Sequence, residues 1–387
     1  MTKARMAQTV GWLWALAGVL GGCTYGWPEG AVDATRARID ATTRLVQAAE
    51  SGDPATRTCA IEAVGEVLPD RAGGIVLQGL RDEQPMVRAA AAQAAGAMEL
   101  ASAKSRLQEM AMFKTKGAEP DKRVYASVLG ALHRMGDTKH SRALRDLLGD
   151  PDDESIRAQA AIALGMTKEP AAVDVLRRRL EIELSPLVKI QIVEAMAGLG
   201  DSGALARIEG HAYLTTDTSV AAMEAAARLR TPNASQMLRL IADKPDQSPL
   251  RRVVAYGGLA RLGETSDATY SYCLQAVRTP EGVLEKAFQP YGIKIEPGEV
   301  TRLQRCAAVA IGWMRRRDAV PDLQSVMARA QDGPVRVACA MSILRIVQPM
   351  AAATDLPPAP PKATAPAEPA QRKQPRKPQV RSADAKE

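Results

Sequence analysis

One cysteine near the start of the chain, Cys23, has the surroundings of a residue that is chemically modified. The chain of 387 residues begins with the basic residues Lys3 and Arg5, followed by an apolar run over 10–20 and two glycines. Such a run is too short to span a bilayer core, which needs about 20 apolar residues, but it is typical of a secretory signal peptide. The thiol of Cys23 is the nucleophile that could receive a diacylglyceryl group.

The segment Leu20-Gly21-Gly22-Cys23 resembles the lipobox of bacterial lipoproteins. The resemblance implies that 1–22 is a signal peptide, that lipidated Cys23 is the first mature residue, and that 23–32 is a short linker. In Gram-negative sorting, Asp after the cysteine favours the inner membrane. Thr24 therefore implies a bacterial cell envelope protein, lipid-anchored in the outer membrane and facing the periplasm. An ordinary signal peptide or a buried apolar helix with a chance cysteine is the alternative.

The other cysteines and the histidines form no recognisable site. The chain has three histidines, His133, His140 and His211. None is followed by Glu, no CxxC or HExxH motif accompanies them, and we expect His133 on the surface at a helix end. Four cysteines remain, Cys59, Cys273, Cys306 and Cys339. We expect them to pack as small apolar residues, with disulfides left open. We predict no catalytic residues, no metal, no cofactor and no enzymatic activity.

The elements that must position these residues are expected to be helices. Aromatic residues make up only 3% of the chain, whereas strands are normally rich in aromatic and β-branched residues. The formal charge is +7, but residues outside the signal peptide and the C-terminal tail include 42 basic and 40 acidic side chains. The body is therefore nearly neutral, and we expect no nucleic-acid partner.

An alanine-rich segment recurs through most of the chain, usually with a basic residue near its start. Seven of the eight spacings between copies fall between 30 and 35 residues, and one is 52. Apolar or small side chains at positions −1, +3, +4 and +7 share one helix face. The copies begin at Arg57, Arg88, Lys122, Arg157, Lys189, Ala222, Arg252, Gln304 and Arg336.

The ends of these segments carry helix signals. Asp53, Asp153 and Asp332 lie four residues before a copy's basic residue, where a carboxylate can cap a helix. Glycine inside a helix costs about 1 kcal/mol relative to alanine, so recurring glycines near the far end predict close helix contacts. These glycines are Gly65, Gly96, Gly130, Gly165 and Gly312. Other amphipathic segments alternate with the copies, at 104–113, 138–148, 169–183, 201–213, 232–243, 266–277 and 318–330.

Residues 33–348 resemble HEAT repeats, especially the short HEAT-like repeats of phycobilisome lyase subunits. The resemblance implies an all-α fold, a right-handed α-solenoid of about nine two-helix repeats in which each repeat contacts only its neighbours. The His-Glu pairs that bind iron in HEAT-type deoxyhypusine hydroxylases are absent from this sequence. The basic residue of each copy either forms a ladder with Asp and carbonyl groups of its own or the adjacent turn, or contributes to a stripe for an anionic ligand. We favour the ladder.

The long spacing marks an insertion at about 279–299. Its prolines and glycines preclude one continuous helix. It carries Phe288, Tyr291, Ile293 and Ile295, which we single out as candidate partner-binding residues, because insertions in repeat proteins often carry binding. A loop that folds back over a solenoid edge is the alternative.

The C-terminal segment 349–387 differs sharply in composition from the repeats. Eight prolines fall between 357 and 378, so we expect a disordered tail. Its seven basic residues could contact anionic wall polymer or lipid headgroups, or the tail could simply keep the chain soluble.

Taken together, the sequence favours a lipoprotein scaffold that binds an unidentified protein partner through a HEAT-repeat solenoid at the bacterial envelope. One alternative is an enzyme or enzyme subunit of the HEAT-like lyase type. Another is a structural tether between membrane and cell wall through the basic tail.

Overall fold

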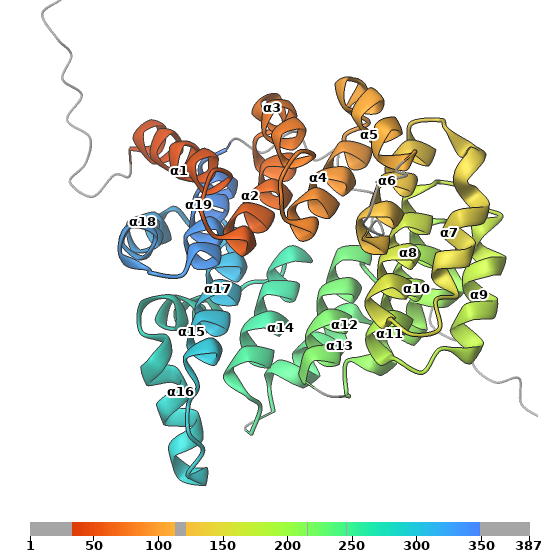
Figure 1. Ribbon diagram of the computed structural model, residues 1–387. Coiled ribbons are helices and arrows are strands. Elements are labelled where there is room, and N and C mark those ends of the chain that lie inside the picture. The colour runs from red at the N-terminus through yellow and green to blue at the C-terminus, as the bar shows by residue number, and fades with distance from the viewer. Residues whose placement is uncertain (1–32, 113–120, 215, 245, 349–387) are drawn as a thin grey trace, which may run out of the picture.

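The computed structural model describes residues 33–112, 121–214, 216–244 and 246–348. The predicted signal peptide, Cys23, the linker and the tail 349–387 lie outside these residues. Across the described ranges the chain forms helices and turns and no strand (Figure 1). None of the helices in these ranges is long and apolar enough to cross a membrane.

Within the described residues the helices form two layers and nine repeats. Each repeat pairs an inner helix with one outer helix, or with two in the eighth repeat. The outer helices of the described residues are α1 (Ala34–Ala48), α3 (Pro69–Gly79), α5 (Lys104–Ala111), α7 (Ser141–Leu148), α9 (Ala172–Ile182), α11 (Leu205–His211), α13 (Ala234–Ala242), α15 (Asp267–Arg278), α16 (Pro280–Phe288) and α18 (Val320–Arg329). The inner helices are α2 (Pro54–Val67), α4 (Pro85–Ala97), α6 (Lys122–Arg134), α8 (Glu154–Met166), α10 (Pro186–Gly198), α12 (Thr216–Leu229), α14 (Pro249–Arg261), α17 (Pro297–Met314) and α19 (Gly333–Val347). The predicted all-α solenoid of about nine two-helix repeats is confirmed, and each predicted copy lies in one inner helix.

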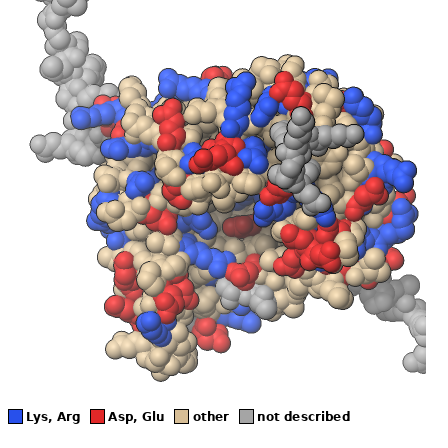
Figure 2. All heavy atoms as spheres, viewed as in Figure 1, with Lys and Arg blue, Asp and Glu red and all other residues tan. Residues whose placement is uncertain are grey.

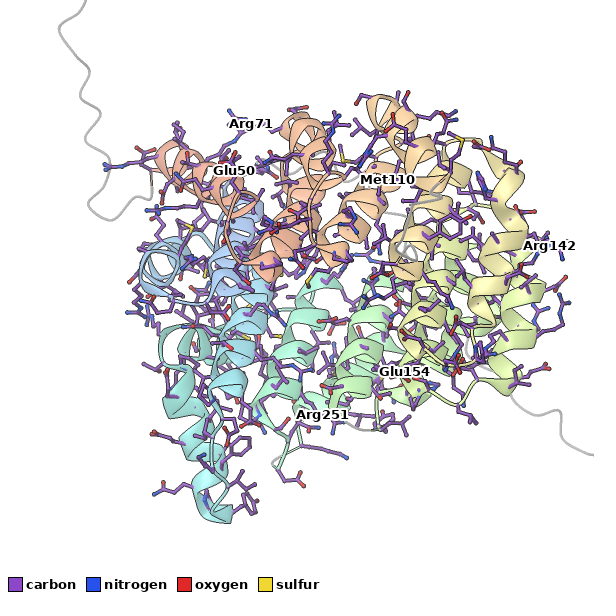
Figure 3. All side chains as sticks on the ribbon, in the orientation of Figure 1. Glu50, Arg71, Met110, Arg142, Glu154 and Arg251 are labelled. Carbon is purple, nitrogen blue, oxygen red and sulfur yellow. The ribbon has the colours of Figure 1, made fainter. Side chains whose placement is uncertain are left out.

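The inner helices begin where the sequence predicts. Asp53, Asp153 and Asp332 are the N-caps of α2, α8 and α19, and each side chain accepts a hydrogen bond from a backbone N–H of the first turn. These caps satisfy donors that the helix itself leaves free, and they place a negative charge at the positive end of the helix dipole. The outer layer carries charged side chains that point away from the core, such as Arg71 of α3 and Arg142 of α7 (Figure 3).

The stack of repeats closes on itself. Each inner helix packs on the next, and the last one, α19, packs against both α1 and α2 of the first repeat (Figure 1). Leu45 of α1 and Ile343 of α19 are fully buried in one apolar cluster. The expectation that each repeat contacts only its neighbours along the chain is therefore wrong at the ends. Closure covers an apolar face that each terminal repeat would otherwise expose to water.

Glycines at the far ends of inner helices allow the close packing of the ring. A Cβ added to Gly130 would lie 2.8 Å from Cβ and 2.9 Å from Cα of Ala163 on the next inner helix. Gly96, Gly165 and Gly312 are equally close to backbone or Cβ atoms of the following inner helix, which confirms the predicted contacts. Gly65 is the exception, because its nearest neighbour is the flexible side chain of Met98 at 3.8 Å.

Replacing Gly130 with Ala should destabilise the protein by about 1–2 kcal/mol, because the new methyl group overpacks a contact with backbone atoms. Gly74 of α3 is the matched control, because a Cβ there would meet nothing within 4 Å. Gly74→Ala should instead stabilise by about 0.5–1 kcal/mol through helix propensity. Urea unfolding of both variants measures the difference. A Gly130→Ala variant as stable as the wild type would contradict the packing argument.

Candidate functional site

The basic residues that begin the copies form a local ladder. Arg57 donates from Nε and Nη2 to the Asp82 carboxylate at 2.7 and 2.8 Å, and also to the carbonyl of Ser51. Arg336 donates to the carbonyls of Ala330 and Gln331. Arg88, Lys122, Arg157 and Arg252 make equivalent bonds to carboxylates or carbonyls of adjacent turns. The ladder interpretation is confirmed for these six positions, where the basic residues serve the fold.

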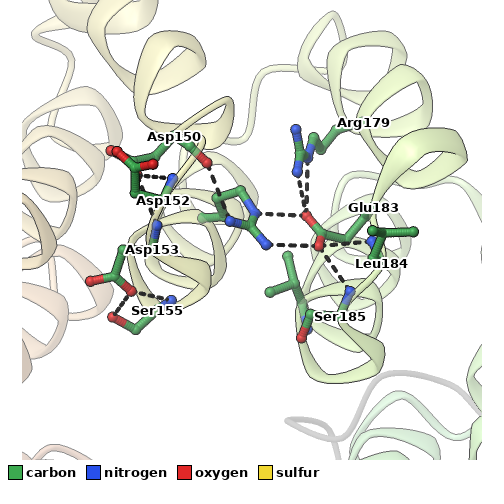
Figure 4. A network of polar contacts seen from close by, with 10 residues as sticks. Asp150, Asp152, Asp153, Ser155, Arg179, Glu183, Leu184 and Ser185 are labelled. Carbon is green, nitrogen blue, oxygen red and sulfur yellow. Dashed lines mark hydrogen bonds and ion pairs between the residues drawn. The ribbon is translucent and has the colours of Figure 1, made fainter.

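The most buried node of this ladder is Glu183, at the turn between α9 and α10 (Figure 4). Its carboxylate accepts hydrogen bonds from the guanidinium groups of Arg157 and Arg179 and from the backbone N–H groups of Leu184 and Ser185. Burial by itself would raise the pKa of Glu183, but these donors outweigh it and lower the pKa from 4.5 to about 2. Because Arg157 belongs to the fourth repeat and Glu183 to the fifth, this cluster of hydrogen bonds joins the two repeats.

The last repeat packs on the first at a seam between α19 and the helices α1 and α2. Inside the ring, beside this seam, lies a hollow of about 510 Å³. It is lined by five inner helices that are consecutive around the ring, namely α12, α14, α17, α19 and α2. The hollow opens on the face shown in Figure 2, where acidic atoms are visible inside it and basic side chains lie beside it. Its charged lining residues are Arg228, Arg261, Arg305, Arg345, Glu62, Glu66 and Glu224.

Trp313 of α17 lines this hollow and contacts two of its arginines. The guanidinium carbon of Arg345 lies 4.3 Å from the centroid of the Trp313 ring, and that of Arg261 lies 4.6 Å from it. Two cations over one indole ring are held by cation–π attraction, which strengthens where water is excluded. Arg345 also donates from Nε to Oε1 of Glu66 at 2.8 Å. This ion pair crosses the seam, because Glu66 belongs to the first repeat and Arg345 to the last.

Two further carboxylates, Glu62 and Glu224, project into the hollow. Both are open to water there, yet protein atoms surround them on most sides. Burial raises the pKa of both, and the positive charge of Arg305 partly offsets this at Glu62. Arg228 pairs with Glu194 of α10, so that one arginine at the rim is already neutralised.

Cys59 and Cys306 also line the hollow, and both are partly accessible. Burial raises the pKa of both thiols, that of Cys306 to about 11, so they are protonated near neutral pH. Cys273 and Cys339 are buried, as expected for small apolar residues. All four cysteines of the described residues are free thiols.

The histidines and acidic residues of the described part of the chain form no group that could hold a metal ion. The expectation that His133 lies on the surface is wrong. It is 6% exposed, and its Nε2 lies 3.1 Å from Ser141 Oγ and 3.1 Å from Glu169 Oε2. The next outer helix packs over the end of α6 and buries this ring.

The predicted partner-binding residues lie on an arm made of α16 and the segment 289–296. The arm projects beyond the ring (Figure 1), and the insertion is not one continuous helix, as predicted. Tyr291 and Ile293 are 69% and 52% exposed at its tip. Phe288 and Ile295 instead are partly buried against the core, so the four residues do not form one exposed patch.

Sequence reasoning missed the hollow, although a signal for it exists. Glu66, Arg261, Trp313 and Arg345 all stand nine residues after the start of their copies. In the copies starting at Arg88, Lys122, Arg157 and Lys189 the same position holds Ala, Ala, Met and Gly. Aligning the copies would have shown that charged and aromatic residues replace small or apolar ones at this position in the first repeat and the last three. Only closure brings Glu66 to Arg345.

Comparison with known protein families agrees with the repeat architecture. A family model described as HEAT repeats matches residues 42–112 and 115–197, which confirms the predicted resemblance. One similar solved structure is the complex of CpcE and CpcF of phycocyanin lyase from Nostoc sp. PCC7120, with 20% identity, a TM-score of 0.33, and coverage of 61% of this chain and 93% of that one. Another is human deoxyhypusine hydroxylase in complex with glycerol, with 14% identity, a TM-score of 0.35, and coverage of 81% and 97%. No curated protein matches the sequence.

Proposed function

We propose that this HEAT-repeat protein is a lipid-anchored scaffold of the bacterial envelope that holds a closed ring at a membrane surface and binds a partner protein there. HEAT repeats form solenoids suited to protein interaction. The anchor at Cys23 and contacts of the basic tail with anionic polymer or lipid headgroups rest on the sequence alone. The proposal assigns the protein no catalytic step.

The observation that carries the proposal is the arm with two large apolar side chains exposed at its tip, Tyr291 and Ile293. Val283 and Leu284 at its base are buried in the core, so the arm is fastened to the ring. Exposed apolar side chains on a projecting element are typical of a protein-binding site.

Crosslinking in the envelope followed by mass spectrometry tests the partner contact. The double variant Tyr291→Ser/Ile293→Ser should lose the partner crosslinks while its helicity and melting temperature stay unchanged, because both side chains are exposed. The control is Ile182→Ser/Leu184→Ser, which removes two other large apolar side chains, 68% and 87% exposed, at the turn after α9. Equal crosslinking by both variants would refute the arm as the contact. Point variants are preferable to deletion, which would uncover core residues.

The anchor is tested separately by metabolic labelling with a palmitate analogue. Wild-type protein should carry the label and fractionate with the outer membrane, and Cys23→Ala should carry none. Cys59→Ala is the control and should be labelled like the wild type, because its thiol lies inside the ring. Labelling of the Cys23→Ala variant would exclude lipidation at this residue without bearing on the arm.

A further inference from the structure

The hollow contains guanidinium groups whose hydrogen-bonding capacity is only partly used. Arg345 is 7% exposed, and its Nη1 is buried without a hydrogen-bond partner although Nε and Nη2 bond Glu66. Arg261 contacts the ring of Trp313 but forms no hydrogen bond or ion pair with any residue that the structure describes. Nη1 of Arg345 has no surface open to the hollow, so Arg261, which is partly exposed, is the guanidinium group with unused donors that a ligand can reach.

The placement of charges in the lining defines the kind of ligand. The hollow is lined by four arginines and three glutamates, but Arg228 is paired with Glu194, so the remaining charges balance overall. Arg261 and Arg345 stand together over Trp313, and only Arg345 has a carboxylate partner there. Burial, followed by the nearby charge of Arg228, lowers the pKa of Arg261, and the charges of Glu66 and Glu224 offset this only in part. One monoanion would pair with Arg261, whereas a dianion such as phosphate would meet stronger repulsion from Glu62 and Glu224.

The shape of the lining adds an apolar requirement. Val309, Val337 and Met341 contribute to the same hollow as Trp313. A volume of about 510 Å³ lies within the range of small-molecule pockets. The guanidinium group presents a planar fork of N–H donors that matches the two oxygens of a carboxylate. The ligand that fits these features has one carboxylate and an apolar body.

We propose that the hollow at the ring seam binds an organic monocarboxylate, with Arg261 contacting the carboxylate and Trp313 and its apolar neighbours contacting the body. The carboxylate belongs either to a free small acid or to the C-terminus of a peptide, since both offer the same chemistry. The site is distinct from the arm, so binding here does not depend on the scaffold proposal.

Isothermal titration calorimetry on the full-length protein tests the site with N-acetylphenylalanine and with a pentapeptide ending in phenylalanine. Each probe is compared with its C-terminal amide. At least one acid should bind, and its amide should bind about tenfold more weakly or not at all, because the amide has no charge to offer. Binding of the small acid alone indicates a free metabolite, and binding of the peptide alone indicates a protein terminus. No binding of either acid at millimolar concentration, or equal binding of acid and amide, overturns the proposal.

Two variants separate the site from general electrostatics. Arg261→Gln should weaken binding of the acid about tenfold or more with little change in the melting temperature, because it breaks no ion pair and loses only the contact with Trp313. Arg71→Gln on the outer layer makes the same change in net charge and should leave the affinity unchanged. Phenyl phosphate serves as the dianionic probe. Wild-type affinity in Arg261→Gln, or tighter binding of phenyl phosphate than of the acids, also overturns the proposal.

Discussion

Replacing Glu183 with Gln is expected to lower the free energy of unfolding at pH 7 by about 3 kcal/mol. The carboxylate is buried and accepts hydrogen bonds from two arginines and two backbone N–H groups (Figure 4). A lowering of the pKa from 4.5 to about 2 corresponds to about 3 kcal/mol, at about 1.4 kcal/mol per pKa unit. Gln has the same shape but no charge, and its amide N–H₂ would face donors rather than acceptors.

The same node predicts a pH dependence. Because the pKa of Glu183 is lower in the folded state, its contribution is fully present above about pH 4.5 and is lost as the pH falls from 4.5 towards 2. The difference in stability between wild type and Glu183→Gln should therefore shrink through this range. Guanidinium unfolding at a series of pH values between 3 and 7 measures it.

Glu181→Gln is the matched control for this experiment. Glu181 lies two residues before Glu183, in the last turn of α9, and its side chain is exposed. Its replacement should change stability by less than about 0.5 kcal/mol at every pH. A loss below about 1 kcal/mol in Glu183→Gln at pH 7, or a loss that does not vary down to pH 3, would show that the node contributes little.

The second large effect is expected at the seam of the ring, where Gly333→Ala should destabilise the protein by about 3 kcal/mol and open the ring. A Cβ on Gly333 of α19 would lie 1.8 Å from Oγ1 and 2.8 Å from Cβ of Thr56 on α2. Both residues are buried, so the first and last repeats must move apart. Overpacking of a core typically costs about 1–3 kcal/mol, and the seam also loses apolar contacts of α1 when it opens.

Chemical unfolding and small-angle X-ray scattering together test the seam. Gly333→Ala should increase the radius of gyration as well as lowering stability. Gly298→Ala is the control, because Gly298 also lies in the first turn of an inner helix but has nothing within 4 Å of the added Cβ. Adding Thr56→Ala removes two atoms of the clash, so the double variant should recover part of the loss. Equal behaviour of the Gly333 and Gly298 variants would show that the ring is open in solution.

Much of the architecture follows from local features that the sequence displays directly. Asp53, Asp153 and Asp332 cap helices because a carboxylate at that position reaches free N–H groups a few residues away. Gly96 and Gly130 identify close contacts between successive inner helices, because a helix tolerates glycine at a cost that packing must offset. These effects act within one repeat or between adjacent repeats, so the sequence of a single copy is enough to predict a helix cap or a close helix contact.

The candidate site is a different matter, because its parts are far apart in the chain. Tyr291 and Ile293 are exposed as a partner-binding arm requires, but the pattern of apolar residues could not distinguish them from Phe288 and Ile295, which pack on the ring. His133 illustrates the same limit. The helix that buries it comes later in the chain, so the residues next to His133 in the sequence do not indicate its burial.

The sequence by itself therefore determined the helices, their caps and the repeat period, and lipid modification of Cys23 stays a prediction from the sequence. Only the tertiary structure decided that the nine repeats close into a ring and that Glu66, Trp313 and Arg345 meet in its hollow. The physical reason is that closure depends on a small rotation between neighbouring repeats, added over the whole stack. The total rotation cannot be predicted from the sequence of any single repeat, whereas the helix signals of each repeat can be recognised in that repeat alone.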